Sequence, residues 1–198
     1  MTAARRLATA SNAGRAAPGR RNRVRIIAGT WRSRVVHFPD SPGLRPTPDR
    51  VRETLFNWLG QYLDGLACLD LFAGSGALGF EALSRGAKRV VMVEQDRATA
   101  RALRESAAAL EAGSAQIVES EALRFLETSG ERFDIAFVDP PYASQLVHAV
   151  LERMPPHLNP GARVYAESAD PIELPAPWRA VRADRAGAVH FGLYEWTP

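Results

Sequence analysis

Leu69-Asp70-Leu71-Phe72-Ala73-Gly74-Ser75-Gly76-Ala77-Leu78-Gly79 joins an apolar strand pattern to a helix pattern through a glycine-rich turn. Glycine at such a turn lets the backbone approach a ligand closely, because no Cβ stands in the way. The segment therefore predicts an α/β protein that holds a nucleotide-like cofactor where this strand ends.

Apolar runs and helix-like segments alternate on the C-terminal side of this turn. We expect strands at 66–72, 89–94, 115–119, 133–138 and 162–168, and helices at 48–63, 77–85, 97–111, 121–128 and 143–154. This alternation is typical of a parallel, doubly wound sheet. Two further strand-like segments between Trp178 and Trp196 are joined around Ala186-Gly187 with no helix between them, so they should pair antiparallel. The expected sheet has seven strands.

Three segments are expected along the chain. Residues 1–22 contain almost no large apolar side chains, so we expect a disordered basic tail. Residues 23–46 contain two β-branched runs separated by Gly29-Thr30, which predicts a hairpin with exposed arginines that binds RNA. Residues 47–198 should form the catalytic domain, in which Thr47 is expected to cap a helix that has Pro48 in its first turn.

Charge is unevenly distributed along the chain. The formal net charge is +3, but residues 1–52 contain twelve Arg against two Asp, so they carry +10 and the remainder about −7. Such a basic front favours nucleic acid as the partner. The single cysteine, Cys68, excludes a disulfide framework and a cysteine-based zinc site, and no metal is expected. No apolar run approaches the roughly 20 residues of a membrane span, and no secretory signal is evident, so we expect a soluble, cytoplasmic protein.

The glycine pattern alone leaves two cofactors open. Gly74, Gly76 and Gly79 also satisfy the dinucleotide fingerprint, and Glu94 ends the next strand at a position that suits the ribose hydroxyls of either cofactor. Asp70 favours S-adenosylmethionine, because a carboxylate would repel a pyrophosphate but can pair with the ammonium of an amino acid.

Asp139-Pro140-Pro141-Tyr142 follows an apolar strand at the edge of the sheet where open α/β folds bind ligands. The two prolines stiffen the turn and leave carbonyl groups free to accept hydrogen bonds. The Asp139 carboxylate and the Pro140 carbonyl can therefore hold the two N–H groups of a base amine, and Tyr142 can stack on that base once it is flipped out.

The chain resembles the bacterial 16S rRNA guanine-N2 methyltransferase family called RsmD over nearly everything after residue 22. The resemblance rests on residues 25–29, 41–59, 69–79 and 137–142. It implies a Rossmann-like class I methyltransferase fold, S-adenosylmethionine as the methyl donor, and one guanine of 16S rRNA in an assembling 30S subunit as the acceptor. It also implies that Asp139, Pro140, Pro141 and Tyr142 carry catalysis. We expect a monomer as the default, since the sequence does not indicate an oligomeric state.

Two sets of binding residues complete the expected site. The cofactor set is Asp70, Phe72, Ala73, Gly74, Gly76, Glu94, Gln95, Glu121, Ala122 and Asp139. The RNA set is Arg25, Arg32, Arg45, Thr47, Arg50 and Arg52. Glu121 stands where relatives often have Asn or Asp, and the long basic tail is not part of the common pattern.

Three other functions remain open. Related sites that begin Asn-Pro-Pro-Tyr methylate adenine N6 or a glutamine amide, so the acceptor amine could differ. The glycine pattern alone would also allow an NAD-dependent oxidoreductase. A catalytically idle RNA-binding assembly factor is the third alternative, and it predicts no role for the Asp139 carboxylate.

Overall fold

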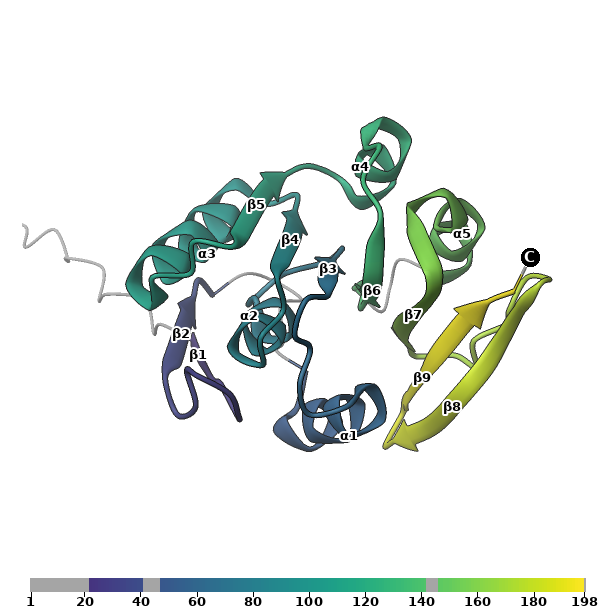
Figure 1. Ribbon diagram of the computed structural model, residues 1–198, viewed down its shortest axis with the longest axis horizontal. Helices are drawn as coiled ribbons and strands as arrows, with labels where there is room; N and C mark the ends of the chain where they lie inside the picture. The colour runs from purple at the N-terminus through teal and green to yellow at the C-terminus, as the bar shows by residue number, and fades with distance from the viewer. Residues whose placement is uncertain (1–21, 41–46, 142–145, 198) are drawn as a thin grey trace, which may run out of the picture.

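The computed structural model describes residues 22–40, 47–141 and 146–197 of the chain. The predicted tail, apart from Asn22, and residues 41–46 of the predicted RNA-binding segment lie outside these residues. A central sheet runs through the molecule between two layers of helices, and a small hairpin packs at one side (Figure 1). No helix of the described residues is long and apolar enough to cross a membrane.

The central sheet has seven strands in the order β5-β4-β3-β6-β7-β9-β8. Its strands are β3 (Ala67–Asp70), β4 (Arg89–Glu94), β5 (Ala115–Glu119), β6 (Phe133–Val138), β7 (Leu158–Ser168), β8 (Trp178–Ala186) and β9 (Val189–Trp196). Strands β3 to β7 are parallel, whereas β9 is antiparallel to both of its neighbours. The predicted α/β class, strand number and antiparallel final pair are therefore confirmed.

The chain reverses its direction of travel across the sheet between β3 and β6. Strands β3, β4 and β5 lead outward to one edge, and the chain then crosses back through α4 (Ala122–Thr128) to place β6 beside β3. The carboxyl ends of β3 and β6 flank this switch point, which is where open α/β sheets bind their ligands.

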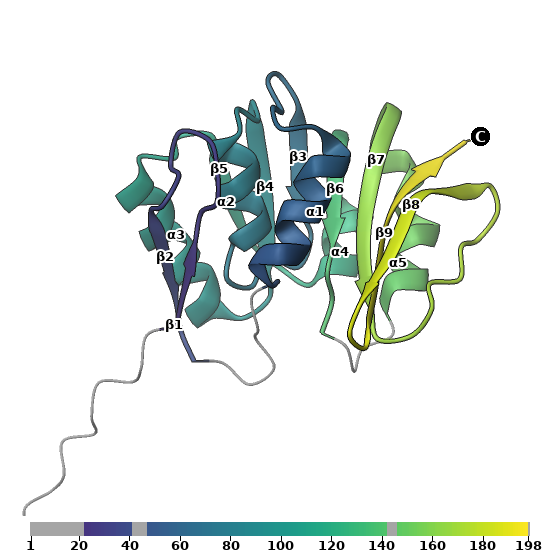
Figure 2. The ribbon, with the colours of Figure 1, turned by 90° about the horizontal axis from the view of Figure 1, so that it is seen from below.

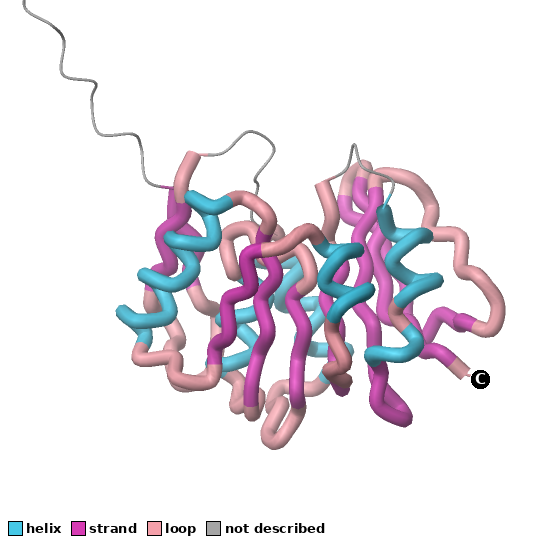
Figure 3. Tube along the Cα trace, turned by 90° about the horizontal axis from the view of Figure 1, so that it is seen from above, coloured by secondary structure: helices cyan, strands magenta, loops and turns pink. Residues whose placement is uncertain are grey.

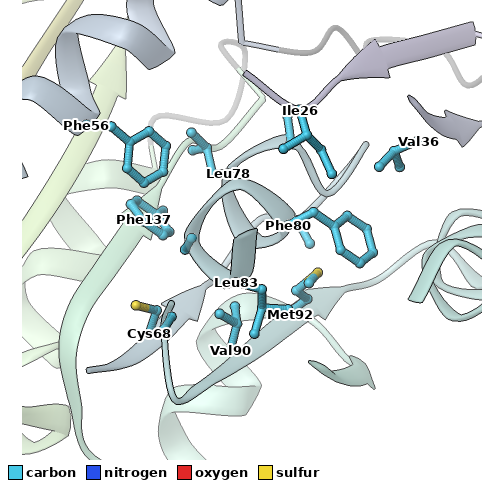
Figure 4. Close-up of a cluster of buried hydrophobic side chains, with 14 of the residues drawn as sticks. Ile26, Val36, Phe56, Cys68, Leu78, Phe80, Leu83, Val90, Met92 and Phe137 are labelled. Carbon is cyan, nitrogen blue, oxygen red and sulfur yellow. The ribbon is translucent and has the colours of Figure 1, made fainter. Parts of the chain in front are cut away.

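Helices cover both faces of the sheet. α1 (Asp49–Leu59), α2 (Ala77–Ser84) and α3 (Arg97–Leu110) contribute to one apolar core, and α4 and α5 (Leu146–Arg153) to the other, on the face toward the reader in Figure 3. In the first core, the rings of Phe56 and Phe137 lie 6.1 Å apart and join α1 to β6 (Figure 4). Burying a side chain of this size contributes about 1.5–3 kcal/mol to stability.

The predicted N-terminal hairpin is present as a separate sheet of β1 (Asn22–Arg25) and β2 (Val35–Phe38). The loop between its strands packs on the C-terminal end of α2, where the amide of Thr30 donates to the Ser84 carbonyl over 2.7 Å. A Cβ on Gly29 would stand 1.8 Å from that carbonyl oxygen, so the close approach requires glycine.

The start of α1 differs from the prediction. Pro48 occupies the cap position, no side chain caps the helix, and Thr47 lies before it. The helix also ends at Leu59 instead of continuing to residue 63, because Gly60 has a φ of 100°. The hydroxyl of Thr47 is used elsewhere, at the end of β6.

Candidate active site at the carboxyl edge of the sheet

The glycine turn after β3 has the backbone that the sequence predicts. Gly74 and Gly76 have φ values of 48° and 75°, in the region that only glycine adopts easily. The amide of Gly76 donates to the Ala73 carbonyl over 2.6 Å, which closes the turn before α2 begins. Phe72 beside the turn is half-buried. The turn therefore brings main-chain groups, and no bulky side chain, to the switch point.

Asp70 lies beneath this turn and is almost fully buried, with 2% exposure. Its Oδ2 accepts the amide of Gly79 over 2.9 Å, which secures the first turn of α2. Burial raises its pKa to about 7; the Gly79 amide opposes this shift, and the charges of Asp139 and Glu94 add to it. The sequence predicts that Asp70 pairs with the ammonium group of the cofactor. The structure shows that Oδ2 of Asp70 also stabilises the glycine turn through its hydrogen bond from Gly79.

Glu94 ends β4 beside the turn. Its Oε2 accepts the amide of Gly74 over 2.9 Å, and its Oε1 accepts the amide of Asp96 over 2.8 Å. Burial raises the pKa of this half-buried carboxyl, while the hydrogen bonds from Asp96 and Gly74 lower it. The adjacent Gln95 is exposed. The two amides fix the direction of the carboxylate, as recognition of a ribose would require.

Glu121 and Ala122 lie close to Glu94 through the backbone, since the amide of Ser120 donates to the Glu94 carbonyl over 3.1 Å. Glu121 is the exposed N-cap residue of α4, and its side chain makes no capping hydrogen bond. Ala122 is buried. The structure thus brings the cofactor residues predicted after β3, β4 and β5 to one edge of the sheet.

Asp139 follows β6 at the same edge. The Thr47 hydroxyl donates to its Oδ2 over 3.0 Å, and the carboxylate is only partly exposed. Burial raises the pKa of Asp139 to about 6, and the Thr47 hydrogen bond lowers it. Pro140 is buried and Pro141 exposed, whereas the predicted catalytic Tyr142 lies outside the described residues.

The acidic character of this edge discriminates between cofactors. Three carboxyl groups, those of Asp70, Glu94 and Asp139, surround the turn, and the ion pairs of the described residues include none of them. Such a site would repel a pyrophosphate but attract the ammonium and sulfonium groups of S-adenosylmethionine. The side chains present therefore fit that cofactor better than a dinucleotide.

The predicted RNA-binding arginines that the structure describes lie on different elements. Arg50 is exposed in the first turn of α1, and Arg25 is exposed at the end of β1. Arg32 is exposed in the hairpin loop that packs on Ser84, at the opposite edge of the sheet (Figure 2). Arg45 lies outside the described residues.

Arg52 was also expected to contact RNA, and its position in the structure argues against this. Its side chain has no exposed surface, and its guanidinium donates to Asp49 over 2.6 Å and to the Arg25 carbonyl over 3.0 Å. It also lies 3.5 Å from Glu81 of α2. Arg52 therefore has a structural role, joining α1, α2 and the hairpin.

Two acidic residues were missed by sequence reasoning. Glu81 interrupts an otherwise apolar helix pattern, and it accepts the amides of Ile27 and Ala28 over 2.7 and 3.0 Å. Glu167 lies near the carboxyl end of β7, beside the strand that leads to Asp139. A carboxylate at that position was a usable signal, because Asp70 and Glu94 also stand at the carboxyl ends of strands.

Cys68 is buried in β3, and burial raises its thiol pKa to about 12. The thiol is therefore not a nucleophile at neutral pH. The described residues contain no group of His, Cys, Asp and Glu side chains that could hold a metal ion.

Comparison with known proteins identifies the relatives of this chain. The family model described as conserved hypothetical protein 95 matches residues 24–195. Ribosomal RNA small subunit methyltransferase D of Escherichia coli K12 is 46% identical over 177 residues, which cover 87% of this chain and 89% of the relative. The protein of the same name from Haemophilus influenzae is 40% identical, covering 90% and 96%. The solved structure of Escherichia coli yhhF is 44% identical with a TM-score of 0.80, covering 87% and 97%.

Proposed function

Because the chain belongs to the RsmD family, which the conserved hypothetical protein 95 model describes, we propose that it methylates the exocyclic N2 of one guanine in 16S rRNA. The relatives named ribosomal RNA small subunit methyltransferase D support rRNA methylation. The choice of guanine N2 and of 16S rRNA in an assembling 30S subunit is the finer part of the proposal. The enzyme would act in the cytoplasm as a monomer.

We assign the cofactor site to the turn between β3 and α2. S-adenosylmethionine, when bound, supplies a methyl group on a positively charged sulfur. Gly74 and Gly76 would allow close approach of the main chain, and the oriented Glu94 carboxylate would accept hydrogen bonds from ribose hydroxyls. The Asp70 carboxyl would favour the ammonium group, while Phe72, Ala73, Gln95, Glu121 and Ala122 would line the remainder of the site.

Asp139 is the residue that we assign to the acceptor amine. Its carboxylate and the Pro140 carbonyl are hydrogen-bond acceptors, and a base amine presents two N–H donors. Holding both donors directs the nitrogen lone pair, which is otherwise delocalised into the ring, toward the methyl group. With a pKa of about 6, Asp139 is mostly ionised at neutral pH and can also take the proton that leaves the methylated amine.

The observation that carries the proposal is the position of Asp139 beside the glycine turn, at the point where the strand order reverses. An oxidoreductase with NAD would need the pyrophosphate to lie among the acidic groups of this edge. An assembly factor without catalytic activity would not need an ionised acceptor at the tip of β6. Neither alternative accounts for the residues that are present.

The proposal is tested by methyl transfer to several acceptors. We expect the purified protein to transfer labelled methyl groups from S-adenosylmethionine to 30S particles or 16S rRNA, and nucleoside analysis to give N2-methylguanosine. Asp139→Asn should lower the rate by about 100-fold or more, since positioned acid–base groups contribute that much. Methylation of adenine in DNA or of a glutamine peptide, with rRNA unmodified, would refute the guanine assignment, and a fully active Asp139→Asn variant would refute the mechanism.

A further inference from the structure

Glu167 is a buried carboxyl group that the proposed reaction does not use. Its exposed fraction is 1%, and the Tyr165 hydroxyl donates to its Oε1 over 2.7 Å. A buried carboxylate is costly unless it is paired with a cation, and the ion pairs of the described chain do not include Glu167. A neutral, protonated side chain avoids this cost.

The register of the sheet places Glu167 beside Asp139. Val138, the last residue of β6, pairs with Ala166 of β7, so Asp139, which follows β6, and Glu167 of β7 lie at the same level of the carboxyl edge. Phe137 and Tyr165 both belong to the core on the α1 side of the sheet. Because side chains alternate along a strand, Asp139 and Glu167, two residues further on, face that same side.

We propose that Glu167 is a positioning residue that acts through Asp139: as a neutral acid held by Tyr165, it keeps the negative charge of the carboxyl pair on Asp139. The inference rests on the proposed function, in which the ionised Asp139 holds the acceptor amine. Glu167 itself has no contact with the base in this scheme.

The pKa shifts of the two groups agree with this assignment. Burial raises the pKa of Glu167 to about 8, the charge of Asp139 adds to the shift, and the Tyr165 hydrogen bond opposes it. Asp139, with a pKa of about 6, ionises first. Two interacting carboxyl groups titrate as a pair, so between about pH 6 and pH 8 the pair carries one proton and one negative charge.

The surroundings of Glu167 contain no competing cation among the described ion pairs. From β6 it faces Asp139, and on its own strand it contacts Tyr165. On β9 the residue paired with it is Phe191, which stacks on Trp58 of α1. Asp70 of β3 lies near Asp139, whose charge raises the pKa of Asp70. His190, next to Phe191 on β9, pairs with Ser168 and not with Glu167. The charge that raises the pKa of Glu167 is that of the acid Asp139, which favours the protonated form of Glu167.

The charge of the pair has a consequence for catalysis. Below about pH 6 Asp139 is protonated and accepts hydrogen bonds from the amine poorly. Above about pH 8 Glu167 also ionises. Its carboxylate then repels that of Asp139 and moves it away from the acceptor amine. The rate should therefore be highest when the pair carries a single proton, which gives a bell-shaped dependence of kcat/KM on pH.

Glu167→Gln distinguishes the acid limb of this kcat/KM profile from the alkaline limb, because glutamine resembles the neutral acid but does not ionise. We expect it to retain most of the activity at pH 7 and to lose the alkaline decline, while the acid limb stays. Glu173→Gln, an exposed change between β7 and β8, should keep the wild-type profile and serves as the matched control. A bell-shaped kcat/KM profile that Glu167→Gln leaves unchanged would overturn the assignment. Loss of activity at all pH values in a folded Glu167→Gln variant would also overturn it.

A second measurement does not depend on methyl transfer. Carbon-13 NMR of the side-chain carboxyl groups of the unliganded protein should show Glu167 titrating near pH 8, and Asp139→Asn should move this transition to lower pH. If wild type fails to methylate rRNA, the proposed function fails, and this titration still decides the charge of the pair. A Glu167 transition near its ordinary value of 4.5, or one that ignores Asp139→Asn, would overturn the inference.

Discussion

The Thr47 hydroxyl donates to Asp139 Oδ2 over 3.0 Å and so joins the segment before α1 to the tip of β6. Thr47 had been expected to cap the helix, yet the structure gives its hydroxyl to the carboxylate of the proposed active site. Hydrogen bonds to a charged group contribute about 1.5–3 kcal/mol, more than a typical neutral pair. The bond should therefore affect both the direction and the ionisation of Asp139.

Thr47→Val should move the acid limb of the kcat/KM profile to higher pH. The Thr47 hydrogen bond lowers the pKa of Asp139, so removing it leaves less of the carboxylate ionised near pH 6. We expect a several-fold loss of kcat/KM at pH 6 that largely recovers by pH 7.5, whereas Thr47→Ser should keep the wild-type limb. A loss that is equal at every pH would show that the hydroxyl acts on folding or substrate binding and not on this ionisation.

Asp70→Asn should change how stability depends on pH. The pKa of Asp70 is raised from 3.8 to about 7, so the folded protein binds a proton more tightly than the unfolded chain does. The stability linked to this proton is fully present below about pH 4 and is lost as pH rises through about 7. Urea titrations should show that the free energy of unfolding falls between pH 4.5 and pH 7.5. The fall should be larger in the wild type than in the variant by a few kcal/mol, on the order of this shift.

Gly76→Ala should disturb the cofactor turn. Gly76 has a φ of 75°, and a Cβ there would stand 2.6 Å from the Phe80 ring and 2.7 Å from a Leu103 methyl group. We expect weaker binding of S-adenosylhomocysteine by calorimetry and a fall of about 1–3 kcal/mol in the free energy of unfolding. Gly113→Ala is the matched control, since nothing lies within 4 Å of its added Cβ. Unchanged affinity in Gly76→Ala would show that the turn tolerates a side chain.

Arg50→Gln and Arg25→Gln should weaken RNA binding and flatten its dependence on salt. Each lost phosphate contact should reduce the slope of log K against log salt by about 1. Arg32→Gln should have less effect, because its loop packs at the far edge of the sheet. Arg153→Gln, exposed at the end of α5, is the control. Equal effects of all four changes would indicate nonspecific attraction instead of a defined RNA surface.

Local patterns predicted the parallel sheet and the backbone of the glycine turn well. The ranges 89–94, 115–119 and 133–138 agree with β4, β5 and β6, because each is an apolar run bounded by polar residues. Gly74 and Gly76 adopt the backbone that their position implied. Periodicity and glycine placement are local properties, and the sequence displays them directly.

Contacts between distant segments could not be predicted in this way. The Thr47 bond to Asp139 spans 92 residues, and the Glu81 bonds to Ile27 and Ala28 span 54 and 53. Arg52 looked like a surface cation because it lies among charged residues at the start of the helix, but its partner Glu81 lies on α2. Such pairings depend on how the layers pack, which a single sequence does not reveal.

α2 connects the two ends of the proposed enzyme. It begins at the turn that we assign to the cofactor, and its side chain of Glu81 and carbonyl of Ser84 hold the backbone of the N-terminal hairpin. If the hairpin takes part in RNA binding, as its arginines predict, a ligand that orders one end of this helix also orders the other, and we then expect methyl donor and RNA to bind with positive cooperativity. Thermodynamic linkage then requires that each ligand raises the affinity for the other by the same factor.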